Sequence, residues 1–273
     1  MTITGMLKLF SDKRIVDEVL RLAKNREVVP QFLSGVFGKR PSTLMYKNEL
    51  LSMIRKGALS YHISEEKWRN PMGLEQANDK KKMDSLRLGW DLLIDIDTSY
   101  IGFAKICCEL LVHALEFHGI KDYSIKFSGG SGFHIGVPFE NFPEKVDDKP
   151  VKNMFPEAAQ IIAAYLSEMI REKLKGRLLD AYSEKAILRI TKKDEKELFG
   201  NGFDPYSVIG IDTIAISPRH LFRMPYSLNM KKNFISLPLC KDEVEGFEPE
   251  KAGIERAGFS LPRSAETAVW RVG

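Results

Sequence analysis

The segment that most constrains the fold is Trp90-Asp91-Leu92-Leu93-Ile94-Asp95-Ile96-Asp97. Its apolar residues, bounded by acids, predict a β-strand that crosses a hydrophobic core and ends at a polar edge. Because side chains alternate between the two faces of a strand, Asp95 and Asp97 share one face and the isoleucines beside them share the other. The segment therefore predicts a pair of carboxylates at the end of a buried strand.

The paired carboxylates have two interpretations. Two such groups on one face repel each other unless a cation lies between them or one of them is protonated. Oxygen ligands of this kind suit Mg²⁺ or Mn²⁺. An isolated Asp-x-Asp is more often a pair of polar residues at a strand end, so the pair indicates a metal site only in combination with other motifs.

The composition limits the classes of protein that can present such a strand. A chain of 273 residues with 44% hydrophobic and 29% charged residues is typical of a globular protein. We expect no membrane association, because no apolar run reaches the ~20 residues of a membrane span. Three cysteines, two of them adjacent, favour a reducing compartment: a nucleoid-associated cytoplasmic location, or the nucleus of a eukaryote. The net charge of +4 is compatible with a phosphate-rich partner without indicating one.

Apolar residues at helical spacing predict helices on both sides of the acidic strand. Helices are expected to begin near Ser11 and Ser42, to run over 101–118, and to follow Pro156. In the last of these the apolar stripe is expected to face inward, and it consists of Ala158, Ile161, Ile162, Tyr165, Leu166, Met169 and Ile170.

Further strands are expected over 123–127, 133–137 and 208–212, where apolar and β-branched residues gather in short runs. The charged runs over 79–82 and 192–197 predict solvated loops. We expect one catalytic domain over 1–273. It comprises a helical N-terminal part over 1–60, a core over 61–250 and a tail over 251–273, in which Trp270 is expected to dock.

The helix over 101–118 raises the question of zinc, since it carries Cys107, Cys108, His113 and His118. On a helix Cys107 and His118 share a face but lie about 16 Å apart, and His113 lies on another face. A zinc ion requires four ligands at about 2 Å, which one helix cannot supply. We therefore expect buried core thiols and no zinc.

A glycine-serine turn, Ser128-Gly129-Gly130-Ser131-Gly132, precedes the strand expected over 133–137. Its exposed backbone N–H groups could bind an anion. His134 follows, on the strand face opposite the apolar residues. Glycine-rich hairpins and structural histidines are both common, but their combination is more specific.

A third acid and a basic segment come later in the chain. The strand expected over 208–212 ends in Asp212, and the segment over 219–232 carries Arg223 and Lys231 among apolar residues. In isolation this segment would be a basic surface loop beside core residues.

In this order the motifs resemble those of the archaeo-eukaryotic primase superfamily, most closely the catalytic small subunit of archaeal DNA primase. The resemblance covers about residues 61–249, and 223–228 match the family's R-L-P-G-S-L segment. It implies an α/β (α+β) fold with a mixed, largely antiparallel catalytic sheet flanked by helices. The residues it implies as catalytic metal ligands are Asp95, Asp97 and Asp212, and those it implies as nucleotide-binding are Ser128, Gly129, Ser131, Gly132, His134, Arg223, Asn229 and Lys231.

The chain departs from the family's pattern in three places. Archaeal members usually carry a zinc knuckle between the paired acids and the Ser-Gly turn, and no ligand set for one is evident. Relatives have an arginine in the turn where this chain has Gly130 and Ser131, and a histidine where it has Asn229. Both replacements remove contacts that relatives make to a triphosphate.

The resemblance implies template-directed nucleotidyl transfer with two Mg²⁺ or Mn²⁺ ions. The implied product is a short RNA or DNA primer on single-stranded DNA, made from NTPs or dNTPs, with a primase large subunit as a possible partner. Three alternatives stay open: a repair or bypass polymerase that extends existing ends, a non-catalytic nucleic-acid-binding paralogue, and an unrelated metal-dependent phosphoesterase.

Overall fold

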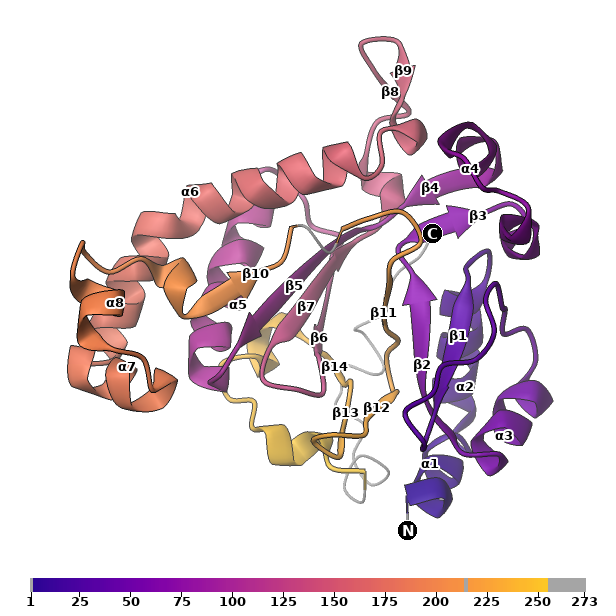
Figure 1. Cartoon of the computed structure of the whole chain (residues 1–273), viewed down its shortest axis with the longest axis horizontal. Helices are drawn as coiled ribbons and strands as arrows, with labels where there is room; N and C mark the ends of the chain where they lie inside the picture. Colours follow the sequence, from indigo (N-terminus) through magenta and orange to yellow (C-terminus); the bar gives the residue numbers. More distant parts are fainter. Residues whose placement is uncertain (1, 214–215, 255–273) are drawn as a thin grey trace.

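The computed structural model describes residues 2–213 and 216–254 of the chain. Helices pack against antiparallel sheets, and a five-stranded sheet lies in the middle of the molecule (Figure 1). Every strand pairing in these two ranges is antiparallel. The predicted class, an α/β fold with a largely antiparallel sheet flanked by helices, is thereby confirmed.

The central sheet has the order β10-β5-β7-β6-β14. Its strands are β10 (Ile209–Ile211), β5 (Leu92–Thr98), β7 (Phe133–Val137), β6 (Ser124–Phe127) and β14 (Pro238–Leu239). The strands expected from the sequence at 123–127, 133–137 and 208–212 are therefore present, and they are neighbours or next neighbours of β5.

One face of this sheet is covered by two helices, α5 (Ile101–Phe117) and α6 (Glu157–Ala181) (Figure 1). Ile94 and Ile96 of β5 are 1% and 0% exposed in the core beneath them. Burying one such side chain contributes about 1.5–3 kcal/mol, so β5 is firmly held by its apolar face. The acids of β5 consequently lie on the opposite face, which we call the acid face.

A second core lies on the acid-face side of the molecule and includes Leu93 of β5. It is built on a three-stranded sheet of β1 (Val28–Phe32), β2 (Ala58–Ser64) and β11 (Leu221–Arg223). The helices that contribute to this core are α1 (Thr2–Leu9), α2 (Lys13–Ala23) and α3 (Lys47–Arg55). Since β11 follows β10 in the chain, the C-terminal third of the chain returns to pair with the N-terminal part.

The remaining elements are short. The strands are β3 (Glu66–Trp68), β4 (Arg87–Trp90), β8 (Lys145–Val146), β9 (Lys149–Pro150), β12 (Leu228–Asn229) and β13 (Phe234–Ile235). The helices are α4 (Lys80–Leu86), α7 (Glu184–Thr191) and α8 (Glu195–Phe199). The 3₁₀ turns are η1 (Pro71–Glu75), η2 (Phe139–Asn141), η3 (Val151–Asn153), η4 (Pro205–Ser207), η5 (Lys241–Glu243) and η6 (Pro249–Ala252).

Both charged runs were predicted as solvated loops, and this prediction is wrong in part: residues 192–194 are irregular, but 80–82 and 195–197 lie in short capped helices. The Asp79 carboxylate accepts the Lys82 N–H at 2.8 Å and begins α4. The Asp194 carboxylate accepts the Lys196 N–H at 2.9 Å and begins α8. Such caps stabilise a helix start by about 1 kcal/mol, which outweighs the preference of a short charged run for coil.

The inward face predicted for α6 is wrong in part. Ile161, Tyr165 and Met169 are 68%, 53% and 41% exposed, whereas Leu166 and Ile170 are buried as expected. The buried stripe includes small residues and continues beyond the predicted segment, through Ala159, Ala163, Leu166, Ile170, Leu174 and Leu178. The buried face of α6 is therefore narrower than its apolar face, and some apolar residues of the helix are exposed.

The N-terminal part is not purely helical as predicted, because β1 lies within 1–60 and β2 crosses the boundary at residue 60. The division into a catalytic core over 61–250 stays a prediction. Most of the predicted tail over 251–273, with Trp270, lies outside the described residues. Within the described ranges, none of the helices has both the length and the apolar character that crossing a bilayer demands.

Candidate active site

The three predicted metal-binding acids lie on two paired strands. Asp95 and Asp97 belong to β5, and Asp212 comes directly after β10. In the β10–β5 pairing Ile211 lies opposite Ile96, so one further step of the same antiparallel register sets Asp212 beside Asp95. All three carboxylates therefore lie on the acid face.

The electrostatics of Asp95 reflect this gathering. The pKa of Asp95 is raised from 3.8 to about 6, chiefly by burial and further by the negative charges of Asp97 and Asp212, while Lys126 and Arg223 oppose the shift. Like charges at short range disfavour ionisation, and a divalent cation among them would reverse that effect. The acids thus form one electrostatic unit.

These acids fit a hard divalent cation by donor chemistry, since Mg²⁺ and Mn²⁺ prefer carboxylate oxygens. As they stand, no three His, Cys, Asp or Glu side chains within 2–213 and 216–254 converge closely enough to hold a metal ion. Asp97 and Asp212 are exposed, and one oxygen of Asp97 accepts the Thr98 N–H at 3.0 Å. Rotation of these exposed side chains is therefore needed to gather the donor set.

The two thiols considered for zinc, those of Cys107 and Cys108, belong to α5 and point into the core. Both are fully buried, as predicted, and burial raises the pKa of both. Their environment is that of packed core residues and not of metal ligands.

The glycine-serine turn is held against β5 by steric necessity. A Cβ at Gly132 would lie 1.7 Å from the Ile96 carbonyl oxygen, so only glycine permits this approach. Gly129 has a φ of +82°, and a Cβ there would lie 3.1 Å from the Asn229 Cβ. Both glycines are thus required where the turn passes between β5 and the β12–β13 hairpin.

The two serines of the turn make internal contacts. The Ser128 hydroxyl accepts the Gly130 N–H at 3.1 Å, and the Ser128 N–H donates to the Gly132 carbonyl at 3.0 Å. The Ser131 hydroxyl donates to the Thr98 carbonyl at the end of β5. Ser131 therefore fastens the turn beside the acids, and only its lone pairs remain for a ligand.

The basic segment predicted as a surface loop in isolation instead forms β11 and a hairpin beside the turn. Arg223 of β11 donates through Nη1 to the Ser128 carbonyl at 3.0 Å. The Asn229 carboxamide accepts the Lys231 N–H at 3.1 Å. Lys231 is exposed in the connection between β12 and β13 and makes no ion pair with any described residue. The structure thus brings Arg223 and Asn229 to the turn and leaves the Lys231 ammonium in solvent.

His134 connects the turn to the acids. It lies on β7 opposite Asp95, and its Nε2 is 3.3 Å from an Asp95 carboxylate oxygen. Burial, with the nearby charges of Lys126 and Arg223, lowers the pKa of His134 well below its ordinary value. The predicted site residues Asp95, Asp97, Asp212, His134, Arg223 and those of the turn are therefore neighbours in space.

Three residues that the sequence did not indicate, Lys126, His62 and His220, act electrostatically on His134. Lys126 lies on β6 opposite His134, so Asp95, His134 and Lys126 form one row across three strands, and Asp212 follows β10 next to Asp95. His62 lies opposite Arg223 on β2, and burial, with the charges of Arg223 and Lys126, lowers its pKa to about 3. A polar residue at an inner position of the strand over 123–127 was the available signal for Lys126, but its partner depends on a register that sequence alone does not fix.

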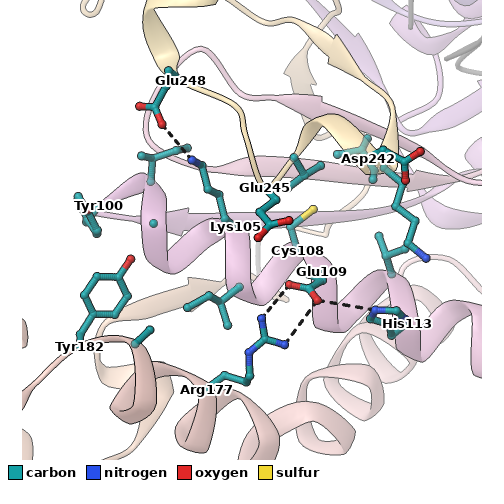
Figure 2. Close-up of a pocket in the computed structure, with 18 residues that line it drawn as sticks. Tyr100, Lys105, Cys108, Glu109, His113, Arg177, Tyr182, Asp242, Glu245 and Glu248 are labelled. Atoms are coloured by element: carbon teal, nitrogen blue, oxygen red, sulfur yellow. Dashed lines mark hydrogen bonds and ion pairs between the residues drawn. The ribbon is translucent and has the colours of Figure 1, made fainter.

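A cavity of about 580 Å³ lies away from this row, along α5 between α6 and residues 241–248 (Figure 2). None of the predicted site residues lines it. Its cations are already paired, Lys105 with Glu248 at 3.3 Å and Arg177 with Glu109 at 3.0 Å. It is therefore not the candidate active site.

Comparisons with known proteins bear on this arrangement. The DNA primase small subunit of Archaeoglobus fulgidus is 29% identical over 60% of this chain and 58% of its own length. An uncharacterized protein of Methanocaldococcus jannaschii is 28% identical over 59% of this chain and 31% of its own length. The chain thus spans less than two thirds of each of these relatives. No protein-family model matches it.

Among solved structures, the polymerase domain of Mycobacterium tuberculosis Ligase D in complex with DNA has the same fold. The TM-score is 0.59 at 14% identity, over 97% of this chain and 88% of that one. The fold therefore matches that of a primase-type polymerase domain. Together with the sequence similarity to the primase small subunit, this fold supports a relationship to the archaeo-eukaryotic primase superfamily.

Proposed function

We propose that this protein is a DNA-directed nucleotidyltransferase that synthesises short RNA or DNA primers on single-stranded DNA. The observation that carries the proposal is the row of Asp212, Asp95 and His134, with the glycine turn and Arg223 beside it.

The proposed reaction is attack of a primer 3′-hydroxyl oxygen on the α-phosphorus of an incoming triphosphate. The new P–O bond forms as the bond to the pyrophosphate breaks, and the hydroxyl proton passes to solvent. Two Mg²⁺ or Mn²⁺ ions on Asp95, Asp97 and Asp212, when bound, lower the pKa of the hydroxyl and offset the charge of the leaving group.

The chain's own residues position the nucleotide in this proposal. The Ser131 hydroxyl, bonded to the Thr98 carbonyl at the end of β5, and the His134 ring, 3.3 Å from Asp95, lie beside the acids, where the triphosphate is expected. Arg223 contributes positive charge from β11, and Lys231 contributes it from the connection between β12 and β13, where Asn229 is its neighbour. Since the sequence supplies no arginine in the turn, these two cations carry a larger share of phosphate binding than in relatives.

A second candidate, a repair or bypass polymerase that only extends existing ends, is favoured by one observation. This chain shares its fold, over 97% of its length, with the Ligase D polymerase domain, which was solved in complex with DNA. To test this, the protein is incubated with single-stranded template, labelled NTPs or dNTPs, and Mn²⁺ or Mg²⁺, with and without a primer. Products formed without a primer support primer synthesis, with a large subunit added as a further arm. Products formed only with a primer support the extension polymerase and overturn primer synthesis.

The same assay separates the remaining alternatives. Shortened nucleic acid indicates a phosphoesterase, and template binding without product indicates a non-catalytic paralogue. Either result overturns the proposed nucleotidyl transfer, with Asp95→Asn protein as the control for contaminating polymerase.

A further inference from the structure

The ε-amine of Lys126 lies inside the protein and contacts the histidine of the proposed site. Its Nζ is 2.9 Å from Nδ1 of His134 and 3.0 Å from the Ser236 hydroxyl. Lys126 and Ser236 are both 0% exposed, and His134 is 6% exposed. The Ser236 hydroxyl in turn donates to the Phe127 carbonyl at 3.1 Å. A continuous hydrogen-bonded chain therefore runs from a backbone carbonyl to the acid face.

The direction of every bond in this chain follows from its two ends. The Phe127 carbonyl can only accept, so the Ser236 hydroxyl donates its proton there and offers its lone pair to Lys126. At the other end Nε2 of His134 lies 3.3 Å from an Asp95 carboxylate oxygen, and an ionised carboxylate can only accept, so this contact favours the proton on Nε2. Nδ1 must then accept, and Lys126 is the donor beside it. This assignment requires two N–H donors of Lys126, which both an ammonium and a neutral amine possess.

The alternative explanation is that Lys126 only balances the charge of the acids. The charge of Lys126 does act on Asp95, but its Nζ is hydrogen-bonded to His134 and Ser236 and forms no ion pair with an acid in the described ranges. Burying an amine also costs free energy that an apolar side chain would not. The contacts instead resemble the outer partners that fix the tautomer and the orientation of functional histidines elsewhere.

We infer that Lys126 is a positioning residue that locks His134 in the Nε2–H tautomer and directs this N–H toward the acid end of the site. The inference rests on the proposed function, since the N–H is then the donor that meets the triphosphate. Lys126 itself does not reach the substrate, because His134 lies between it and Asp95.

The test begins with the unmodified protein. The ring nitrogens of its five histidines are observed by ¹⁵N NMR, and His134 is assigned from the spectrum of His134→Asn. The inference predicts one dominant Nε2–H tautomer for His134 without nucleotide or metal. A dominant Nδ1–H form, or an exchange-averaged pair, overturns it whether or not any variant folds.

Lys126→Met then removes the donor while keeping a long unbranched side chain. The His134 signal is expected to shift toward mixed tautomers, and kcat is expected to fall on the order of 10- to 100-fold, as when an outer partner of a histidine is removed. KM for nucleotide is expected to change less than kcat. Lys67→Met is the matched control, because Lys67 is also buried but is paired with Glu140 at 2.7 Å. The His134 signal of this control variant should be unchanged.

The two proposals fail in different ways. A wild-type protein that incorporates no nucleotide overturns the proposed function, whereas its His134 spectrum still reports on the contact with Lys126. An active wild type with a folded Lys126→Met variant of equal kcat and unchanged spectrum overturns the inference and leaves the proposed function standing.

Discussion

The acids at the two ends of β5 differ in how their charges are compensated. At the start of the strand Asp91 is buried and paired with Arg26, and its other oxygen lies 3.4 Å from Lys67 and accepts the Phe139 N–H at 3.0 Å. At the far end Asp95 and Asp97 lie beside a third acid, and burial, with the like charges of Asp97 and Asp212, raises the pKa of Asp95. The charge of Asp91 is thus compensated within the protein, whereas the charges of Asp95 and Asp97 remain available to a ligand.

The difference shows what each end contributes. The Arg26 guanidinium donates to the Ser64 and Glu65 carbonyls at 2.8 and 2.7 Å as well as to Asp91, so it joins β2 to the central sheet. A charge that is fully hydrogen-bonded in this way supports the fold, whereas uncompensated acids at a strand end reduce stability and gain their partner only on binding. We expect substitutions at the first end to affect folding and those at the second to affect reaction.

The largest effect is expected at the far end. Asp95→Asn, Asp97→Asn and Asp212→Asn should each reduce nucleotide incorporation to background while leaving the circular dichroism spectrum unchanged. Each change removes a metal-binding charge, and metal ions supply several kcal/mol of transition-state stabilisation. Near-normal turnover by any one variant would show that its acid is not a metal ligand.

At the first end, Arg26→Met should destabilise the fold by about 3–5 kcal/mol, because it leaves Asp91 buried without its main partner. Urea denaturation of the variant and the wild type measures the difference. The matched control is Lys13→Met, which breaks the exposed Lys13–Asp17 pair and should change stability by less than about 1 kcal/mol. Equal shifts for the two variants would remove the contrast between the ends of β5.

Lys231→Ala should raise the KM for nucleotide by roughly ten- to a hundredfold, since a charge-assisted contact to phosphate contributes about 1.5–3 kcal/mol. The template Kd should change little, because Lys231 is proposed to meet the triphosphate and not the nucleic-acid backbone. Both constants are measured for the variant and for Lys232→Ala, its exposed neighbour. Loss of template binding alone would assign Lys231 to a general nucleic-acid surface.

The smallest effect concerns pH in metal-free buffer. Because the folded pKa of Asp95 is raised to about 6 from 3.8, the folded state holds this proton more tightly, and stability falls as pH rises through that window. Asp95→Asn should therefore match the wild type below about pH 4 and exceed it above pH 6. Asp95 is 43% exposed, so solvent screening should keep the gain below about 1 kcal/mol. A gain that is equal at all pH values would contradict the raised pKa.

Local patterns predicted the acid end of β5 but not its surroundings. The alternation in β5 and the helical stripe over 101–118 survive in the structure because they report which face is buried. Lys126, His62 and Arg223 come from strands far apart in sequence, and their meeting depends on the registers of β6, β2 and β11. The strand β1, which was not predicted, is likewise held by its pairing with β2.

The central claim, that the acids of β5 and β10 perform templated nucleotidyl transfer, is tested most directly by the identity of the incorporated base. Wild-type protein with Mn²⁺ or Mg²⁺ on a poly(dT) template should incorporate adenine nucleotides in large excess over the other three, and the preference should switch to guanine on poly(dC). Asp95→Asn protein should give no product on either template. Incorporation that ignores the template, or that persists in Asp95→Asn, would contradict the account.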